Sequence, residues 1–207
     1  SFISLRNGYL FDNDTQEYFV AKGFSYQVWN RYVFATQTFE QLEYDLREMK
    51  QMYVNSLRVE ITWSEVELSP GIIFDHTGAG VYDWRKIDHL MVVSAEMGIR
   101  LVILVGYQYP PEFFEQIDGG IHFAVHWDPT INAYGRSNLL NYEDPYARSF
   151  YASFITAVCS RYKNMKHIIG WIVGNEFSFF DLWEVRLEKR QVGHDALFSL
   201  PSFRAYL

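Results

Sequence analysis

The amino-acid sequence predicts an α/β fold built on a parallel sheet. Segments of strand-like composition alternate with segments whose apolar residues recur at helical spacing, and this alternation runs along most of the 207 residues. Residues 99–105 (IRLVILV) are almost continuously apolar, which is typical of a parallel strand covered on both faces. A chain of this length with 49% hydrophobic residues fits one domain, residues 1–207.

The first two predicted strands enclose a predicted helix. Residues 20–26 (VAKGFSY) form the first strand after an N-terminal lead-in, and residues 55–61 (NSLRVEI) form the second. Thr38 begins the helix, because Gln41 three residues later completes a capping-box pattern. The apolar face of this helix comprises Phe39, Leu42, Leu46, Met49 and Met52.

The next helix and strand follow the same rules. Asp83 is the predicted N-cap and Gly98 ends the helix. Its apolar face comprises Trp84, Ile87, Met91 and Ala95. Residues 99–105 then form the third strand, which Pro110 and Pro111 close.

A third helix and a fourth strand complete the pattern. Asp144 and Pro145 are the predicted N-cap and first helical residue. The helix is expected to bury Ala147, Phe150, Phe154 and Val158. Residues 168–173 (IIGWIV) form the fourth strand, residues 177–200 a long loop, and residues 201–207 the start of another helix.

Two folds fit this alternation, a doubly wound sheet and part of an eight-stranded (β/α) barrel. No glycine-rich phosphate loop follows the first strand, which disfavours a nucleotide-binding doubly wound domain. The end of every strand, with the residues just after it, carries polar or aromatic side chains, as expected where a barrel gathers its functional groups. These residues are Gln27, Trp29, Asn30, Arg58, Glu60, Trp63, Tyr107, Gln108, Tyr109, Asn175 and Glu176.

Composition and charge exclude several classes of function. The formal charge of −7 and the absence of a Lys/Arg run argue against a nucleic-acid partner. No segment approaches the ~20 continuous apolar residues of a membrane span. Cys159 is the only cysteine and falls within a predicted helix, which argues against a thiol nucleophile. The compartment is left open, and the 18% aromatic content fits either self-packing loops or a sugar-binding cleft.

The pair Asn175-Glu176 after the fourth strand has the chemistry of glycoside cleavage. A carboxylic acid protonates the leaving glycosidic oxygen, and an amide hydrogen-bonds a sugar hydroxyl near the reacting carbon. The alternative for these two residues is a helix-capping Asn beside a solvated Glu.

Several stretches together resemble the clan A glycoside hydrolases, most closely their retaining β-galactosidase family. The resemblance covers the chain from about residue 20 to its end, and no single motif is decisive. The stretches are LRVEITWSEVE (57–67), SPG (69–71), YDW (82–84), Ile87-Asp88, GIR (98–100), PPEF (110–113), GWIVGNEF (170–177) and PSFRAYL (201–207).

The resemblance implies a (β/α)8 TIM barrel of which this chain holds about the first four βα units. It implies that Glu176 is the general acid/base, that Asn175 holds the hydroxyl next to the anomeric carbon, and that Arg58 keeps the nucleophile ionised. Four aromatic residues are candidates for stacking on sugar, with core packing as the alternative for each: Trp29, Trp63, Tyr107 and Trp127.

The resemblance also places the nucleophile outside this chain, because the family carries it after the seventh strand. The nearby carboxyl groups are those of Glu60, Glu65, Glu112 and Asp181, and Glu60 is interpreted as structural or substrate-positioning. Four strands leave two unpaired edges and an uncovered inner face, so we expect the missing half or a second chain to complete the barrel. Alone, the chain is expected to hydrolyse little or nothing.

The predicted function is a retaining β-glycosidase acting on an oligo- or polysaccharide, with β-galactoside as the first substrate and β-mannoside or β-glucan next. The alternative is a noncatalytic carbohydrate-binding or half-barrel assembly protein. No cofactor and no metal are expected, because carboxyl groups suffice for this reaction. His122 and His126 have helical metal-ligand spacing, but Gly120 and Pro129 around them indicate a loop.

Overall fold

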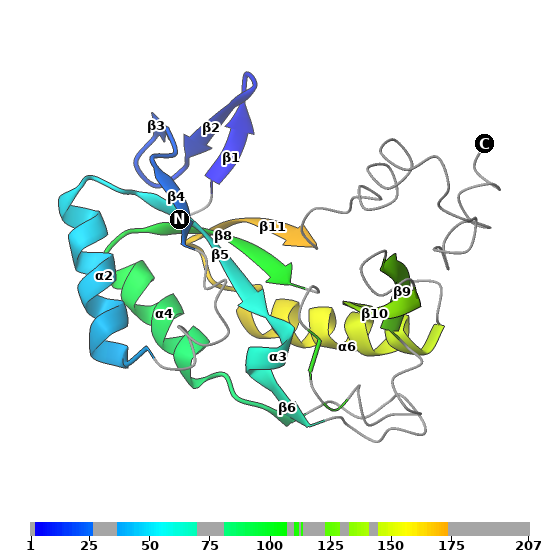
Figure 1. The fold of residues 1–207 in the computed structure, drawn as a ribbon. Helices are drawn as coiled ribbons and strands as arrows, with labels where there is room; N and C mark the ends of the chain where they lie inside the picture. The colour runs from blue at the N-terminus through cyan, green and yellow to red at the C-terminus, as the bar shows by residue number, and fades with distance from the viewer. Residues whose placement is uncertain are drawn as a thin grey trace.

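A four-stranded parallel sheet forms the centre of the protein (Figure 1). The structure is a computed structural model that describes residues 3–26, 37–69, 81–106, 110–111, 113, 123–128, 133–140 and 145–173. The strands are β4 (Gly23–Tyr26), β5 (Ser56–Thr62), β8 (Arg100–Gly106) and β11 (Ile168–Val173). All four predicted strands are present, with ends that differ from the prediction by up to three residues.

The strand order identifies the barrel. The strands lie side by side as β4, β5, β8 and β11, which is their order along the chain, and all three pairs are parallel. A doubly wound sheet would reverse direction at a switch point. Because each crossover is right-handed, an order without reversal puts every connecting helix on the same face. The chain therefore folds as the first βα units of a TIM barrel.

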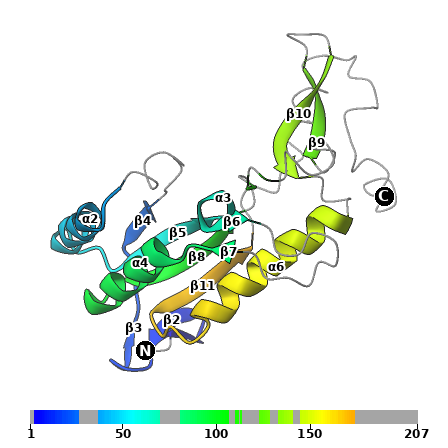
Figure 2. The ribbon, with the colours of Figure 1, turned by 90° about the horizontal axis from the view of Figure 1, so that it is seen from below.

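Three helices cover that single face of the sheet (Figure 2). They are α2 (Phe39–Gln51), α4 (Arg85–Glu96) and α6 (Pro145–Tyr162). A short helix, α3 (Trp63–Val66), follows β5 directly and leads into the antiparallel pair β6 (Glu67–Ser69) and β7 (Val81–Tyr82).

The helix ends agree closely with the predictions. Thr38 caps α2, and both hydrogen bonds of the capping box with Gln41 are present. Gly98 follows α4 with a φ of 66°, a left-handed conformation that favours glycine. The N-cap of α4 is Trp84, one residue later than predicted, although the Asp83 carboxylate still accepts the N–H of Arg85 at 3.1 Å.

The core lies between the helices and the sheet. Alternate strand residues point into it, so Leu57, Val59 and Ile61 of β5 are at most 1% exposed. The predicted core residues of α6 are all buried, whereas Phe39 and Met52 at the ends of α2 are exposed, as is Ala95 of α4. Between α4 and α6, Asp88 accepts hydrogen bonds from Arg161 and Tyr162.

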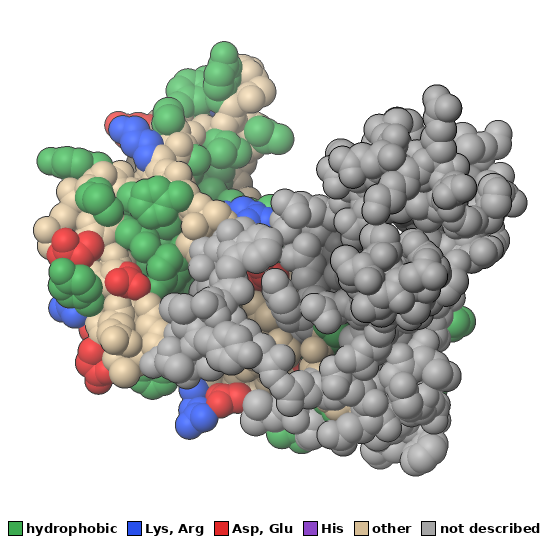
Figure 3. Space-filling view, in the orientation of Figure 1, with side chains coloured by type: hydrophobic (Ala, Val, Ile, Leu, Met, Phe, Trp, Pro, Cys, Tyr) green, Lys and Arg blue, Asp and Glu red, His purple; other side chains and the backbone are tan. Residues whose placement is uncertain are grey.

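The N-terminal lead-in forms a small antiparallel sheet that was not predicted. It consists of β1 (Ile3–Arg6), β2 (Tyr9–Asp12) and β3 (Glu17–Tyr18). Asn7 and Gly8 both have positive φ, 54° and 81°, as a two-residue hairpin turn requires. Leu5, Tyr9 and Tyr18 are each more than half exposed, whereas Phe11 is buried, and hydrophobic side chains gather over this sheet at the top of Figure 3.

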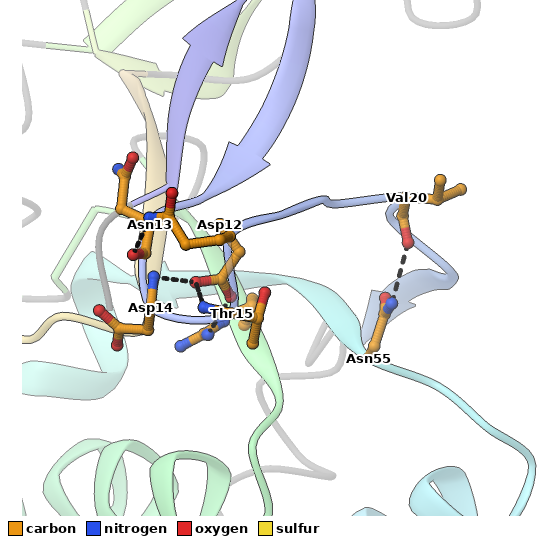
Figure 4. Close-up of polar contacts among 8 residues, drawn as sticks. Asp12, Asn13, Asp14, Thr15, Val20 and Asn55 are labelled. Atoms are coloured by element: carbon orange, nitrogen blue, oxygen red, sulfur yellow. Dashed lines mark hydrogen bonds and ion pairs between the residues drawn. The ribbon is translucent and has the colours of Figure 1, made fainter.

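Polar contacts attach this small sheet to the parallel sheet. Arg100 donates to the Asp12 carboxylate at 2.6 Å, and the backbone N–H of Asp14 donates to the same carboxylate at 2.9 Å. Asn55 donates to the carbonyl of Val20 at 2.9 Å (Figure 4). Its side-chain oxygen also accepts the N–H of Lys22 at 2.7 Å. The small sheet is thus tied to the N-terminal end of β8, and the segment that follows it is tied to the N-terminal end of β5.

A second antiparallel pair lies where the sequence predicted a loop. β9 (Phe123–Asp128) pairs with β10 (Ala133–Leu140), so the loop interpretation of His126 is wrong, and His122 lies outside the described residues. Asp144, the loop 177–200 and the helix expected at 201–207 also lie outside them. No helix within the described ranges is long and apolar enough to cross a membrane.

Candidate active site

The carboxyl ends of the parallel strands meet at one edge of the sheet. Thr62 at the end of β5 lies beside Gly106 at the end of β8, and Val173 at the end of β11 lies beside Val105. In barrel enzymes this is the edge at which reacting groups gather. The residues that follow Val173 along the chain are Gly174, Asn175 and Glu176.

Three polar residues of β5 point away from the helices. Leu57, Val59 and Ile61 face the core, so Arg58, Glu60 and Thr62 face the opposite, inner side of the sheet. This side becomes the interior of a closed barrel, and its residues near the carboxyl ends line the site. The alternation thus confirms that Arg58 and Glu60 share one face.

Arg58 is half-buried and leans toward β4. Its Nη1 donates to the Oγ of Ser25 at 2.9 Å, across the pair in which these two residues are neighbours in register. A guanidinium fixed in this way is a stationary positive charge on the inner face.

Glu60 is buried and lies against the end of β8. It is 3% exposed, and within the described part of the chain its buried Oε1 has no hydrogen-bond partner. A Cβ at Gly106 would fall 2.0 Å from that oxygen, so the space for the carboxyl group exists because residue 106 is glycine. Burial raises the pKa of Glu60, and the charge of Arg58 offsets part of the rise.

Trp63 lies in the core and not on a surface open to sugar. It is 0% exposed, its ring stacks on Phe154 at a centroid distance of 5.4 Å, and Tyr151 packs on it at 5.5 Å. Because its ring is covered, core packing is the role that the structure gives this residue, in place of the predicted stacking on sugar.

Glu67 is a second buried carboxyl group, and the sequence reasoning did not single it out. It is 4% exposed and accepts the indole N–H of Trp63. Burial raises its pKa to about 7, although the hydrogen bond from Trp63 favours the charged form. The available signal was the i, i+4 spacing of Trp63 and Glu67 across the short helix α3.

The remaining predicted site residues are not described. Trp29, Tyr107, Asn175 and Glu176 lie outside the described residues, and so does Glu112. Trp127 lies on β9 opposite Tyr134, with its side chain outside the description. Among the described residues no group of three or more His, Cys, Asp or Glu is placed to hold a metal ion.

Solved structures that resemble this fold include two glycoside hydrolases. The β-galactosidase of the psychrophilic Marinomonas ef1 matches 78% of the chain with a TM-score of 0.60 and 16% identity, and the chain covers 22% of that protein. The endo-1,4-β-mannanase of Rhizomucor miehei matches 85% with a TM-score of 0.56 and 15% identity, and 48% of it is covered. At these identities the likeness establishes the barrel fold.

Sequence comparison reaches the same group of proteins. Mannan endo-1,4-β-mannosidase F of Aspergillus clavatus is 27% identical over 103 residues, which are 47% of this chain and 20% of that protein. The family model described as β-galactosidase, glycoside hydrolase 42, matches residues 31–190, which is more than half of the chain. This chain therefore belongs to the β-galactosidase family of glycoside hydrolases, family 42.

Proposed function

We propose that this chain supplies the acid/base half of a retaining β-glycosidase, with Glu176 as the general acid/base. One observation carries the proposal: β11 ends at Val173, level with the end of β8, at the edge where barrel enzymes gather their reacting groups. Asn175 and Glu176 follow within three residues, and membership of a glycosidase family supports the same role.

The proposed mechanism uses two carboxyl groups. Glu176 protonates the glycosidic oxygen while a second carboxylate, about 5 Å away, attacks the anomeric carbon and forms a glycosyl ester. Glu176 then removes a proton from the water that hydrolyses this ester. Asn175 binds the hydroxyl next to the anomeric carbon, and Arg58 lowers the pKa of the attacking carboxylate.

The attacking carboxylate is proposed to come from outside this chain. Among the described strands, β4 and β11 each pair on one side only, which leaves hydrogen-bonding edges for further strands. The second half of the barrel, in the same polypeptide or in another one, is therefore a proposed part of the active enzyme.

A β-galactoside is the proposed substrate, because the family model that matches residues 31–190 is described as β-galactosidase. A β-mannoside is the second candidate, favoured by the sequence relative named as a mannan endo-1,4-β-mannosidase. Trp29, Tyr107 and Trp127 are the aromatic residues proposed to stack on the sugar.

The test compares leaving groups in the variant Glu176→Ala, assayed in the complete enzyme. An aryl group with a strongly acidic phenol leaves without protonation, so dinitrophenyl β-galactoside should still form the glycosyl ester, whereas a galactosyl disaccharide should not be cleaved. Added azide should then restore turnover and give a β-galactosyl azide, because azide needs no general base.

Equal activity of Glu176→Ala and wild type on the disaccharide would exclude Glu176 as the acid. Saturable sugar binding without hydrolysis in the wild-type enzyme would support the noncatalytic carbohydrate-binding alternative. Running galactosides and mannosides in parallel identifies which of the two is the substrate.

A further inference from the structure

Glu60 is a buried carboxyl group that has no part in the scheme above. It is 3% exposed on the inner face of β5, and its Oε1 is buried without a hydrogen-bond partner in the described part of the chain. Buried polar atoms in folded proteins nearly always have a partner, so each exception calls for an explanation.

The absence of a side chain at Gly106 leaves the space that the Glu60 carboxyl group occupies. Its Oε1 occupies the place where a side chain at residue 106 would begin, 2.0 Å from the ideal Cβ position. Gly106 is the last residue of β8, so the carboxyl group lies at the carboxyl edge of the sheet. This is the edge at which the proposed acid/base follows β11.

Arg58 is the cation whose charge acts on Glu60, and it also donates a hydrogen bond to another strand. Arg58 lies two residues earlier on the same face, but its Nη1 donates to Ser25 on β4, whereas the Glu60 carboxyl group lies over β8. The charge of Arg58 lowers the pKa of Glu60 only in part, because burial outweighs it and the net shift is upward. A carboxyl group that is readily protonated can both donate and accept a hydrogen bond.

A purely structural role does not account for these features. An unpaired buried oxygen is destabilising, and a leucine of similar size would avoid that cost beside the fully buried Leu104, its neighbour on β8. A ligand hydroxyl would supply the missing partner, since a hydroxyl both donates and accepts.

We propose that Glu60 is a substrate-binding residue whose carboxyl group hydrogen-bonds a hydroxyl of the bound sugar where β5 and β8 end. This inference rests on the glycosidase function proposed above and adds one specific contact to it. It gives a role to a residue of the second barrel strand, far along the chain from Glu176.

The test measures binding and stability together in the complete enzyme. Isopropyl β-thiogalactoside and methyl β-thiomannoside, which resist hydrolysis, are titrated calorimetrically into wild type, Glu60→Gln, Glu60→Leu and Glu67→Gln. Glu67→Gln is the matched control, because Glu67 is equally buried but already accepts the Trp63 indole N–H. Hydrolysis of p-nitrophenyl β-galactoside and thermal unfolding are followed on the same samples.

We expect Glu60→Leu to weaken thioglycoside binding about tenfold or more while unfolding at the same or a higher temperature than wild type. Glu60→Gln, which keeps hydrogen-bonding groups, should lose less affinity, and its KM should rise more than its kcat falls. Glu67→Gln should bind as wild type does.

Unchanged binding in both Glu60 variants, with hydrolysis intact, would overturn this inference and leave the glycosidase proposal standing. Binding that depends on Glu60 in an enzyme without hydrolysis would uphold the inference and overturn the glycosidase proposal. Absence of thioglycoside binding in the wild type would overturn the inference as well.

Discussion

The two buried carboxyl groups near the end of β5 differ in their partners. Glu67 accepts a hydrogen bond from the indole of Trp63, and the ring of Trp63 stacks on Phe154 in the core. Glu60 faces the inner side of the sheet, where its Oε1 has no partner among the described residues. Burial raises the pKa of both carboxyl groups, but among the described residues only Glu67 has a hydrogen-bond donor for its carboxyl group.

Glu67 predicts a specific pH dependence of stability. Burial raises the pKa of Glu67 to about 7 in the folded protein, above its ordinary value of 4.5, so the folded state binds the proton more tightly than the unfolded state. The contribution to stability is therefore fully present below the unfolded value and is lost as the pH rises through the window up to about 7.

Replacing Glu67 with Gln should remove this loss, because Gln stays neutral and still accepts the Trp63 N–H. The free energy of unfolding of wild type relative to Glu67→Gln should fall between about pH 4.5 and about pH 7, by at most ~1.4 kcal/mol per pH unit. Urea unfolding followed by tryptophan fluorescence measures the difference. Parallel pH profiles for the two proteins would contradict the assignment.

Gly106 should tolerate alanine poorly. The added Cβ would overlap Glu60, 2.0 Å from Oε1 and 2.9 Å from Cδ, so we expect Gly106→Ala to destabilise the fold by about 1–3 kcal/mol. The double variant with Glu60→Ala should recover most of this loss. Gly170→Ala is the control, since its Cβ would lie 3.6 Å from Val102, an ordinary contact. Equal costs for the two glycines would refute the packing argument.

Residues near the start of α2 determine where this helix begins. The side chain of Thr38 accepts the N–H of Gln41 at 3.2 Å, and the Gln41 side chain accepts the N–H of Thr38 at 2.8 Å. Both hydrogen bonds join residues three apart, so neighbouring residues alone determine where α2 begins.

Thr38→Ala should lower the free energy of unfolding by about 1 kcal/mol, because an N–H at the start of α2 loses its acceptor. Thr156→Ala on the exposed face of α6 is the control, as it removes a threonine whose hydroxyl only donates to the carbonyl of Ala152. It should change stability by less than ~0.5 kcal/mol. Denaturant unfolding compares the two, and a cost at Thr156 equal to that at Thr38 would argue against the cap.

The strands away from the parallel sheet were harder to predict. The turn of the β1–β2 hairpin consists of Asn7 and Gly8, a pair that is a strong hairpin signal. Residues 3–6 (ISLR) before it alternate between apolar and polar, but residues 9–12 (YLFD) after it do not. β9 lies between Gly120 and Pro129, which indicated a loop, and β10 follows that proline. In both cases strand pairing, a contact between segments, outweighed the local composition.

A nearly buried ion pair between Asp12 and Arg100 joins the small N-terminal sheet to the parallel sheet. Burial alone would raise the pKa of Asp12, but the hydrogen bonds from the N–H groups of Asp14 and Thr15 and from Arg100 hold it below its usual value. Stability from this group is therefore present above its unfolded pKa of about 3.8 and is lost as the pH falls below that value.

Asp12→Asn should cost about 2 kcal/mol at neutral pH, because Arg100 loses a charged acceptor while the turn keeps a side-chain oxygen. Below about pH 4 the difference between Asp12→Asn and wild type should shrink. Asp83→Asn, which breaks the exposed pair with Arg85, should cost less than ~1 kcal/mol. Urea unfolding at several pH values measures both, and a constant difference down to acid pH would contradict the role of Asp12.

Local patterns in the sequence were sufficient to locate the parallel strands, the three long helices, the caps at Thr38 and Gly98, and the alternation that puts Arg58 and Glu60 on one face. These features depend on neighbouring residues and on the periods of helix and strand, both of which are visible in one segment at a time. The strand order, the burial of Trp63 and the unpartnered Glu60 beside Gly106 depended on tertiary structure. Each of these features arises from contacts between segments that are far apart along the chain. Neither the hydrophobic period nor a local motif predicts which distant residues come into contact.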